Sequence, residues 1–389
     1  MNKSALKALS TAALALPGVS TQVQANDSKV GVRLHNYSEG DVAAGDVDGT
    51  TTDRYGIKVG QFMLTTSIAD NLNLALSYQQ ETMSGASPWY TKKLSSGQVK
   101  QVMSGASIAD TRKDWNAAIQ YKLDNITLST NLAQSKEDDY ASTSYGLGLG
   151  YEFSDNVTSV NLAVDTSDDE LNPAGTQASI LSDKKESWSG FIAVSRIINK
   201  NLIAQIGVGI SHKSGYLSDP YKKVNFSIAN KLELAADTRP EERQAKTLAT
   251  KIRYFIPKLN SALHFDYRFY QDDWEVVSHT YDLAWYQNLN YGWQIIPSIR
   301  FYAQTESFFY ENYYEIKRPD NFHSTDYRLS GYGAYTLGLK LNKRFEDWLF
   351  TIGYQNYQSD SNYGFSQPNE ASLSLIDFQL FSLGFDYSF

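Results

Sequence analysis

Apolar and polar residues alternate along most of this chain, and the alternation is clearest at the C-terminal end. Apolar side chains occupy every second position there, at Phe381, Leu383, Phe385, Tyr387 and Phe389. This spacing places them on one face of a β-strand. In a soluble protein such a strand would be an exposed edge that pairs with other chains. A closed barrel in a lipid bilayer removes the edge and gives the apolar face a matching solvent.

From residue 29 onward, alternating segments of roughly ten residues are separated by breaks of two kinds. Short breaks are rich in the turn residues Asn, Asp, Pro and Ser, and they alternate with longer polar connections. The short breaks are 69–71, 124–125, 154–156, 199–201, 257–260, 288–290 and 346–347. The long connections are 39–52, 83–111, 136–142, 165–186, 213–243, 311–325 and 358–374, and one on the same side, 271–275, is short.

This asymmetry is typical of outer-membrane barrels, which have tight periplasmic turns and long external loops. It predicts an all-β fold, a transmembrane antiparallel up-and-down barrel of about 16 strands within the range of about 14–18. Both termini would then lie in the periplasm. A soluble β-sandwich or solenoid also alternates, but it would not explain the loop asymmetry.

The first residues have the composition of a secretory signal peptide. Lys3 and Lys7 accompany a stretch of small and apolar residues, and Val23-Gln24-Ala25 fits a cleavage site. The apolar stretch is too short to cross a membrane as a helix, and the alternative is a buried N-terminal helix. We predict that residues 1–25 are a signal peptide and that residues 26–389 form a single barrel domain.

The composition narrows the function classes. The chain has no cysteine, which excludes disulfides, thiolate metal sites and covalent haem attachment, and we predict no cofactor. A net charge of −8 argues against nucleic acid as a partner. The 27 tyrosines, 18 phenylalanines and 7 tryptophans suit the aromatic girdles of a membrane barrel.

Alternation also assigns side chains to the two faces of the barrel wall. An Arg or Lys that faces lipid near the middle of the bilayer costs about 2–4 kcal/mol, so a shift of one residue is strongly disfavoured. The predicted lumen-lining residues are Arg253, His264, Asp266, Arg268, Asp282, Arg300, Tyr302, Glu306, Arg328 and Lys340. Two interpretations remain open, a charged wall that filters solutes and a network of paired charges that only stiffens the wall.

The segment 83–113 contains a partial repeat, because the sequence of residues 103–108 is similar to that of residues 83–88. Its small residues allow close packing, so we consider a loop that folds into the barrel as a constriction or plug. The alternative is an exposed mobile loop. The predicted constriction residues are Met103, Ser104, Gly105, Ala106, Ser107, Asp110 and Arg112.

Three runs resemble a family of uncharacterised bacterial proteins that are predicted outer-membrane barrels. They are 101–112, the run 266–274 with Ser278-His279-Thr280, and 300–304. The resemblance covers nearly the whole mature chain and extends in a general way to porins. It implies the barrel fold and the outer membrane of a Gram-negative bacterium. It also implies a small lipoprotein or a periplasmic redox protein as a partner.

The C-terminal strand resembles the signal that the barrel-assembly machinery of the outer membrane reads. Tyr387 and Phe389 would be the aromatic residues of this assembly signal. The other expected partners are outer-membrane lipid and lipopolysaccharide. Acidic clusters at 137–139 and 165–170 either bind divalent cations that bridge lipopolysaccharide or are solvated loops, and they match no EF-hand spacing.

The sequence contains no HExxH, GxSxG or Walker pattern. Ser278 and His279 lie near two aspartates, but adjacent residues of a strand point to opposite faces and do not form a nucleophile–base pair directly. We therefore expect no enzyme and no catalytic or metal site. The leading hypothesis is a porin-like channel for small hydrophilic solutes with a charged lumen. The alternatives are a barrel sleeve around a lipoprotein or redox partner and a plugged surface-interaction protein.

Overall fold

The structure is a computed structural model that describes residues 28–104, 110–173, 183–228, 231–366, 368 and 371–389. The predicted signal peptide, residues 1–25, therefore lies outside the described residues. The helical elements of the described chain are the short 3-10 turns η2 (Pro257–Leu259), η3 (Asn290–Gly292), η4 (Tyr327–Leu329) and η5 (Ser361–Tyr363). No helix within the described ranges is long and apolar enough to span a membrane.

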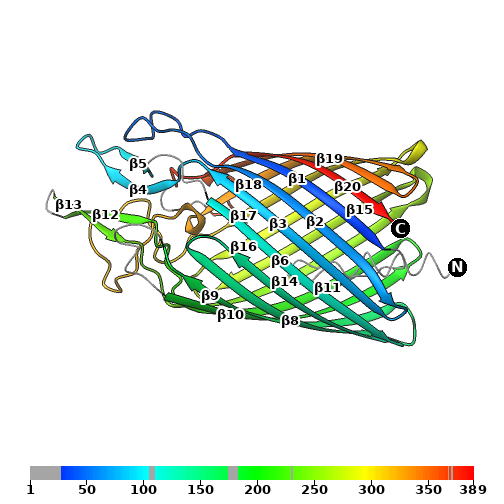
Figure 1. The fold of residues 1–389 in the computed structure, drawn as a ribbon. Coiled ribbons are helices and arrows are strands. Elements are labelled where there is room, and N and C mark those ends of the chain that lie inside the picture. Colours follow the sequence, from blue (N-terminus) through cyan, green and yellow to red (C-terminus); the bar gives the residue numbers. More distant parts are fainter. Residues whose placement is uncertain (1–27, 105–109, 174–182, 229–230, 367, 369–370) are drawn as a thin grey trace.

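Sixteen antiparallel strands close into a barrel, in which β1 pairs with β20 (Figure 1). The barrel strands are β1 (Lys29–Glu39), β2 (Gly56–Ala69), β3 (Leu72–Ser84), β6 (Asp110–Leu123), β7 (Ile126–Lys136), β8 (Tyr140–Glu152), β9 (Thr158–Leu171), β10 (Asp183–Asn199), β11 (Leu202–Gly215), β14 (Glu242–Ile256), β15 (Ser261–Asp272), β16 (Val277–Asn288), β17 (Trp293–Gln304), β18 (Tyr332–Phe345), β19 (Trp348–Asp360) and β20 (Phe378–Ser388). Neighbours in the barrel follow chain order, so the predicted up-and-down fold is confirmed.

Short turns and long loops lie at opposite ends of the barrel, as the sequence predicts. β1 begins and β20 ends at the end with the short turns, which we call the terminal end (Figure 1). Asp124, Asn156 and Asn260 adopt φ angles of 49°, 53° and 49° in these turns. Asn and Asp tolerate this left-handed conformation better than most residues. We call the opposite end, where the long connections gather, the loop end.

The seam between the first and last strands is held by the backbone and by an ion pair. Ser28 and Phe389 exchange backbone hydrogen bonds of 3.1 and 2.8 Å. The Nη2 atom of Arg33 donates to both carboxylate oxygens of Asp386, at 2.8 and 2.7 Å. Asp386 is almost completely buried, so this charge-assisted contact joins β1 to β20 from the lumen side.

Large apolar side chains cover the outside of the wall. Leu147, Leu337 and Leu339 are 69%, 58% and 55% exposed, and in each strand such residues alternate with polar ones. Exposure of this kind would be unfavourable in water, but lipid is a suitable solvent for it. The outward face is therefore the one that the alternation predicts.

The largest fully buried side chains of the described chain lie in the long connections. Two hairpins, β4 (Pro88–Lys93) with β5 (Val99–Met103) and β12 (Lys223–Ile228) with β13 (Lys231–Ala236), extend from the loop end (Figure 1). Fully buried Phe226, Phe309 and Tyr314 belong to these connections. We call the described residues of 40–55, 85–104, 216–241, 305–331 and 361–377 the loop cap.

Candidate functional site

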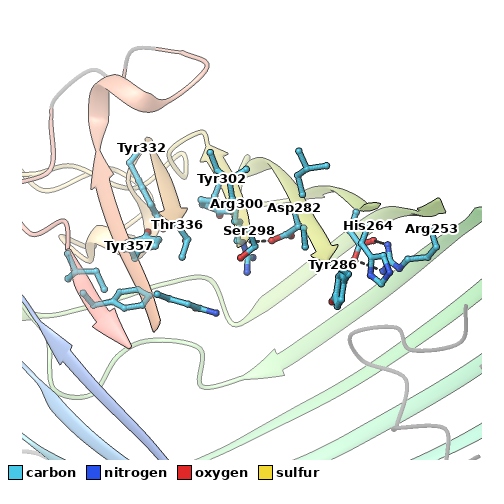
Figure 2. A pocket seen from close by; sticks show the side chains of 17 residues that line it. Arg253, His264, Asp282, Tyr286, Ser298, Arg300, Tyr302, Tyr332, Thr336 and Tyr357 are labelled. Atoms are coloured by element: carbon cyan, nitrogen blue, oxygen red, sulfur yellow. Dashed lines mark hydrogen bonds and ion pairs between the residues drawn. The ribbon is translucent and has the colours of Figure 1, made fainter. Parts of the chain in front are cut away.

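A hollow of about 510 Å³ lies on the lumen side of strands β14 to β20 (Figure 2). The side chains that line it come from alternate positions of these strands, because residues of one parity face the lumen. The lining residues include Arg253, His264, Asp266, Asp282, Tyr286, Ser298, Arg300, Tyr302, Tyr332, Thr336, Tyr357 and Phe378. The hollow thus combines charged groups of both signs with tyrosine rings.

Arg253 and Asp266 form the firmly held pair of this site. The guanidinium of Arg253 contacts both carboxylate oxygens of Asp266, one of them at 3.0 Å. It also donates to the backbone oxygens of Ile252 and Phe265, at 3.0 and 3.3 Å. This bidentate arrangement fixes the orientation of the guanidinium. Arg253 is thereby positioned as part of the wall.

Arg300 and Asp282 are held much more loosely. They face each other directly across β16 and β17, and the Nε atom of Arg300 lies 3.8 Å from Oδ1 of Asp282. The two side chains remain 53% and 46% exposed. An exposed contact of this length contributes little energy. Both charged groups therefore remain accessible to a solute in the lumen.

Aromatic rings form the rest of the hollow. The rings of His264 and Tyr286 lie 4.1 Å apart between centroids. Tyr357 stacks on Phe378 at 4.5 Å with nearly parallel planes. Tyrosine combines an apolar ring with a hydroxyl group, so this surface suits ligands that have both polar and apolar parts.

The opposite strands carry small side chains at one level. There the paired inward positions of β7, β8 and β9 are Ser129, Gly148 and Ala163. Ser129 lies so close to Gly148 that a Cβ atom at this glycine would stand 2.3 Å from the serine Oγ atom. These three positions therefore add little bulk to the lumen.

Most of the predicted lumen residues come together. Arg253, His264, Asp266, Asp282, Arg300 and Tyr302 all line the hollow. Arg268 is at a lumen-facing position of β15, as Asp266 is, and Lys340 is at a lumen-facing position of β18, as Thr336 is. Neither Arg268 nor Lys340 lines the hollow itself. Both are exposed. In the part of the chain that the structure describes, Arg268 has no ion-pair partner.

The assignments of Glu306 and Arg328 to the strand walls are wrong. β17 ends at Gln304 and β18 begins at Tyr332, so both residues lie in the loop cap. The chain leaves the barrel early because the connection 305–331 has its own core, in which Phe309, Tyr310 and Leu329 pack with Trp274. The predicted loop, 311–325, is therefore too short at both ends.

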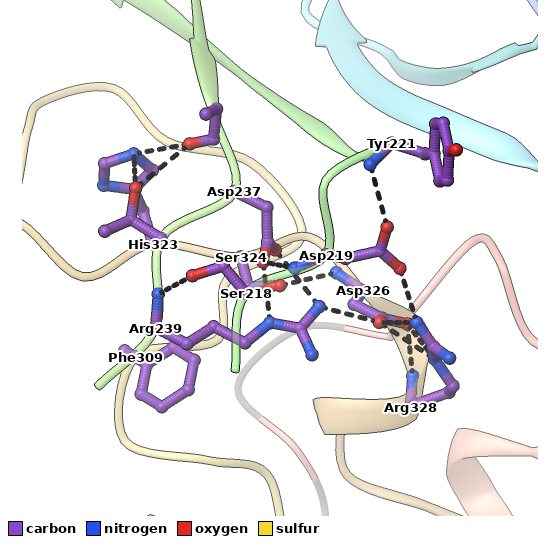
Figure 3. A network of polar contacts seen from close by, with 12 residues as sticks. Ser218, Asp219, Tyr221, Asp237, Arg239, Phe309, His323, Ser324, Asp326 and Arg328 are labelled. Atoms are coloured by element: carbon purple, nitrogen blue, oxygen red, sulfur yellow. Dashed lines mark hydrogen bonds and ion pairs between the residues drawn. The ribbon is translucent and has the colours of Figure 1, made fainter. Parts of the chain in front are cut away.

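Arg328 instead belongs to a charge network around the buried Asp326, and its own side chain is 56% exposed (Figure 3). Its Nε atom donates to both oxygens of Asp326 at 2.9 Å, and its Nη2 atom reaches Asp219 at 2.8 Å. Arg239 donates to Asp237 at 2.7 Å and to Asp326 at 2.9 Å. The network therefore ties segment 216–241 to segment 305–331.

The Asp326 carboxylate is completely buried at the centre of this network. Burial alone would raise its pKa. The positive charges of Lys222, Arg328 and Arg239, together with the hydrogen bonds from Arg328, instead hold the pKa of Asp326 far below its usual range. The carboxylate therefore stays ionised, and the loop cap depends on its ion pairs.

The predicted constriction residues are only partly described. Met103 belongs to β5 and packs with Val47 and Ala86, and Ser104 accepts a hydrogen bond from the backbone of Ser87. Gly105, Ala106 and Ser107 lie outside the described residues. The described part of this loop is thus a hairpin in the loop cap, where its apolar side packs against the segment 40–55, and the constriction stays a prediction.

Asp110 and Arg112 lie at the loop end of β6. The guanidinium of Arg112 contacts Glu81 at 2.8 Å, Asp114 at 3.3 Å and Glu137 at 3.8 Å. Carboxylate oxygens of Asp110, Glu137 and Asp139 lie within 4.8 Å of one another. Arg112 offsets part of this negative charge. These residues form part of the rim of the wall.

Tyr387 and Phe389, the predicted assembly-signal residues, lie at lipid-facing positions at the end of β20. The Tyr387 ring lies 4.7 Å from that of Trp348 and 6.0 Å from that of Phe389. Phe389 is 64% exposed. The two aromatic side chains therefore lie at the terminal end, on the outer surface of the barrel.

Several aromatic residues of the hollow are absent from the predicted lumen face. Tyr286, Tyr332, Tyr357 and Phe378 line it but carry no charge, and the assignment of the lumen face rested on charged residues. Alternation along 277–288 and 348–360 contains the signal that would have found Tyr286 and Tyr357, because they share the parity of Asp282 and Gln355.

Solved structures with a similar form include a siderophore receptor, PirA from Pseudomonas aeruginosa, at 8% identity and a TM-score of 0.46. The alignment covers 91% of this chain but only 61% of that receptor. A BenF-like porin from Pseudomonas fluorescens Pf-5 matches at 7% identity and a TM-score of 0.45, over 93% of this chain and 98% of the porin. The outer membrane protein opdK from Pseudomonas aeruginosa matches at 6% identity and a TM-score of 0.43, over 93% and 99%.

These values describe similarity of form and carry no inference about solutes. A comparison with curated proteins finds no match to this sequence. The model of the family described as "Protein of unknown function (DUF3570)" matches residues 6–376, which is nearly the whole chain. The suspected resemblance to an uncharacterised family of barrels is therefore confirmed, and this chain belongs to the DUF3570 family.

Proposed function

We propose that this protein is a porin-like channel of a Gram-negative outer membrane that passes small hydrophilic solutes through a charged lumen. The termini face the periplasm and the loop cap faces the outside, an orientation that the short turns and long loops favour. The observation that carries the proposal is the hollow of about 510 Å³ in which Arg300 stays half exposed. A barrel of about 16 strands is wide enough for an aqueous channel.

The charges of the β14–β18 wall favour anions as the transported class. On these five fully described strands, positive side chains outnumber carboxylates at the inward positions. The positive residues are Arg243, Lys251, Arg253, Arg268, Arg300, Lys340 and Arg344, and the carboxylates are Asp266, Asp272 and Asp282. A surface with one excess sign raises the local concentration of oppositely charged solutes. The wall is therefore suited to small organic or inorganic anions, although the whole chain is acidic.

Single-channel conductance of the refolded barrel in a planar bilayer tests this proposal. We expect steady conductance, with a reversal potential in a salt gradient that shows preference for the anion. A barrel that is folded but silent would contradict the channel, and a conducting barrel with cation preference would contradict the solute class.

A second candidate, a surface-interaction protein with a closed barrel, is favoured by the interlocked loop cap. Arg54 pairs with Glu39 at 2.8 Å, with both side chains buried, and donates to the backbone oxygen of Ser374 at 3.3 Å. Lys222 reaches the backbone oxygen of Pro88 at 3.0 Å. Loops held this firmly suit a surface that other molecules bind. Loss of whole-cell binding after proteolytic removal of the loops, together with a silent barrel, would support this candidate.

A further inference from the structure

A second hollow lies on the outside of the barrel, where no solute of the lumen can reach it. Strands β20, β1, β2 and β3 lie side by side (Figure 1), and a groove of about 670 Å³ crosses their lipid-facing surface. Its walls are apolar and are formed by Val32, Leu34, Phe62, Tyr78, Phe381 and Leu383. We call it the outer groove.

Gly60 accounts for the depth of the outer groove. It is paired with Leu34 on β1 and with Gln80 on β3. A Cβ atom placed on Gly60 would meet only the Leu34 Cδ2 atom, at 4.0 Å. A lipid-facing position without a side chain, between Leu34 and Phe62, leaves space in which a hydrocarbon chain makes van der Waals contacts.

The loop end of the outer groove is polar and positively charged. Lys58 lies two residues from Gly60 and is paired with Asn36 and Thr82, all of which line the groove. The amide and hydroxyl groups there donate and accept hydrogen bonds. The groove thus changes from apolar to cationic along its length, as a membrane changes from acyl chains to headgroups.

Two further lysines extend this positive surface. Lys113 on β6 is paired with Gln80 of the groove and, on its other side, with Lys136 on β7. Lys58, Lys113 and Lys136 are all exposed, and each is at a lipid-facing position of its strand. Two like charges placed opposite each other destabilise a strand pair. Within the described chain, none of the three lysines has an ion-pair partner, so an external anion would relieve the repulsion.

We propose that the outer groove and Lys58, Lys113 and Lys136 form a binding site for an acylated, phosphate-bearing lipid of the outer leaflet. One acyl chain lies along Leu34, Gly60 and Phe62, and the phosphates contact the lysines. Neighbouring strands are about 4.8 Å apart, so the row from β2 to β7 accommodates a headgroup with more than one phosphate. This site is independent of whether the lumen conducts.

Native mass spectrometry of the detergent-purified, folded barrel tests the site, with lipid A that carries two phosphates as the probe. We expect the barrel to retain this lipid in preference to the same lipid after enzymatic dephosphorylation. A basic residue near a charged membrane surface contributes about 1 kcal/mol, or about fivefold in affinity. Lys58→Gln should therefore weaken retention about fivefold, and the triple replacement of Lys58, Lys113 and Lys136 by Gln should weaken it further.

Matched controls separate this site from general attraction to the barrel. Lys246→Gln removes another exposed lipid-facing lysine, on β14, and should leave retention unchanged. Gly60→Leu fills the groove and should abolish retention, whereas Gly190→Leu, at a lipid-facing glycine of β10 whose Cβ would meet Ile210 at 3.9 Å, should not. Folding of each variant is checked by heat-modifiable mobility on a gel.

The same experiment contains the outcomes that would overturn the proposal. Equal losses for Lys58→Gln and Lys246→Gln would mean that the barrel attracts anionic lipid without a specific site. Unchanged retention in Gly60→Leu would show that no acyl chain occupies the groove. Displacement of the lipid by inorganic phosphate at equal concentration would identify a free-anion site in place of a lipid site.

Discussion

One ion contact of the barrel wall and one of the loop cap are held in opposite ways. In the wall, Arg300 and Asp282 are about half exposed and their closest atoms are 3.8 Å apart. In the cap, Asp326 is completely buried and receives hydrogen bonds from two arginines. Arg300 and Asp282 therefore remain accessible from the lumen, whereas the Asp326 carboxylate stabilises the fold of the cap. The same residue types are thus accessible at one place and buried at the other.

The difference follows from what surrounds each region. A strand of the barrel has lipid on one side and the lumen on the other, so few of its side chains are fully buried. The long connections can pack on one another, and Phe226, Phe309 and Tyr314 are the outcome. A buried charge must be paired, which explains the ion contacts that surround Asp326. Four experiments test this difference between Asp326 and Arg300.

The largest effect is expected from Asp326→Ala. Removing one partner of a buried ion pair costs about 3–5 kcal/mol, and here Arg239 and Arg328 both lose the carboxylate that they share. The loop cap should open while the barrel stays closed. Limited proteolysis and hydrogen exchange should show faster cleavage and exchange at 216–241 and 305–331, with heat-modifiable mobility unchanged.

The matched control for Asp326→Ala is Asp320→Ala. Asp320 pairs with Arg318 at 2.7 Å, but both side chains are partly exposed, and such pairs contribute about 0–1 kcal/mol. Equal opening of the cap in the two variants would mean that burial does not distinguish the two ion pairs.

The next largest effect concerns the two faces of the wall. Leu339 is lipid-facing and 55% exposed, so Leu339→Arg should destabilise the barrel in a bilayer by about 2–4 kcal/mol. Thr336 lines the lumen hollow on the same strand, and Thr336→Arg should be tolerated. Urea unfolding in lipid vesicles measures both. Equal tolerance of the two changes would contradict the assignment of the faces.

A smaller, pH-dependent effect is expected in the loop cap. His323 is buried beside Phe226 and Tyr314, with Lys317 and Asp237 as its charged neighbours. Burial lowers its pKa from the ordinary 6.5, although the backbone oxygen of Ala236 and the charge of Asp237 oppose this. The unfolded cap therefore binds the proton more readily than the folded cap, and stability falls as the pH drops below 6.5.

Hydrogen exchange of the cap between pH 7 and pH 5 measures this dependence. After division by the intrinsic, base-catalysed rate at each pH, we expect less protection from exchange at the lower pH around 224–226 and 314, and a weaker dependence in His323→Gln. The same slope in both proteins would assign the effect to another group.

The smallest effect on stability is expected from Arg300→Ala. Its exposed contact with Asp282 contributes at most about 1 kcal/mol, so unfolding should hardly change. The reversal potential of the channel should nevertheless shift toward cations, because an accessible positive charge is lost from the lumen. Thr336→Ala, at a neutral position of the same hollow, is the control. A shift of equal size in both variants would show that Arg300 does not select ions.

Local pattern was sufficient to predict much of the lumen wall. Regular strands contain Arg253, Asp266 and Arg300. In such strands successive side chains point to opposite faces, so the position along the strand determines the face of every side chain. The pattern did not reveal Arg328, whose partner Asp219 is 109 residues away in the chain. It also did not reveal the outer groove, because Gly60 and Lys58 form a site only when β20, β1, β2 and β3 lie together.

The barrel, its strand number and the separation of short turns from long loops follow from the pattern of residues along the chain. These features depend on interactions between neighbours in the chain and on a bilayer that separates apolar from polar side chains. The ends of the strands at the loop cap, the burial of charges there and the positions of the hollows follow from the folded arrangement instead. Those features depend on contacts between residues that are distant in the chain, and no local periodicity encodes such contacts.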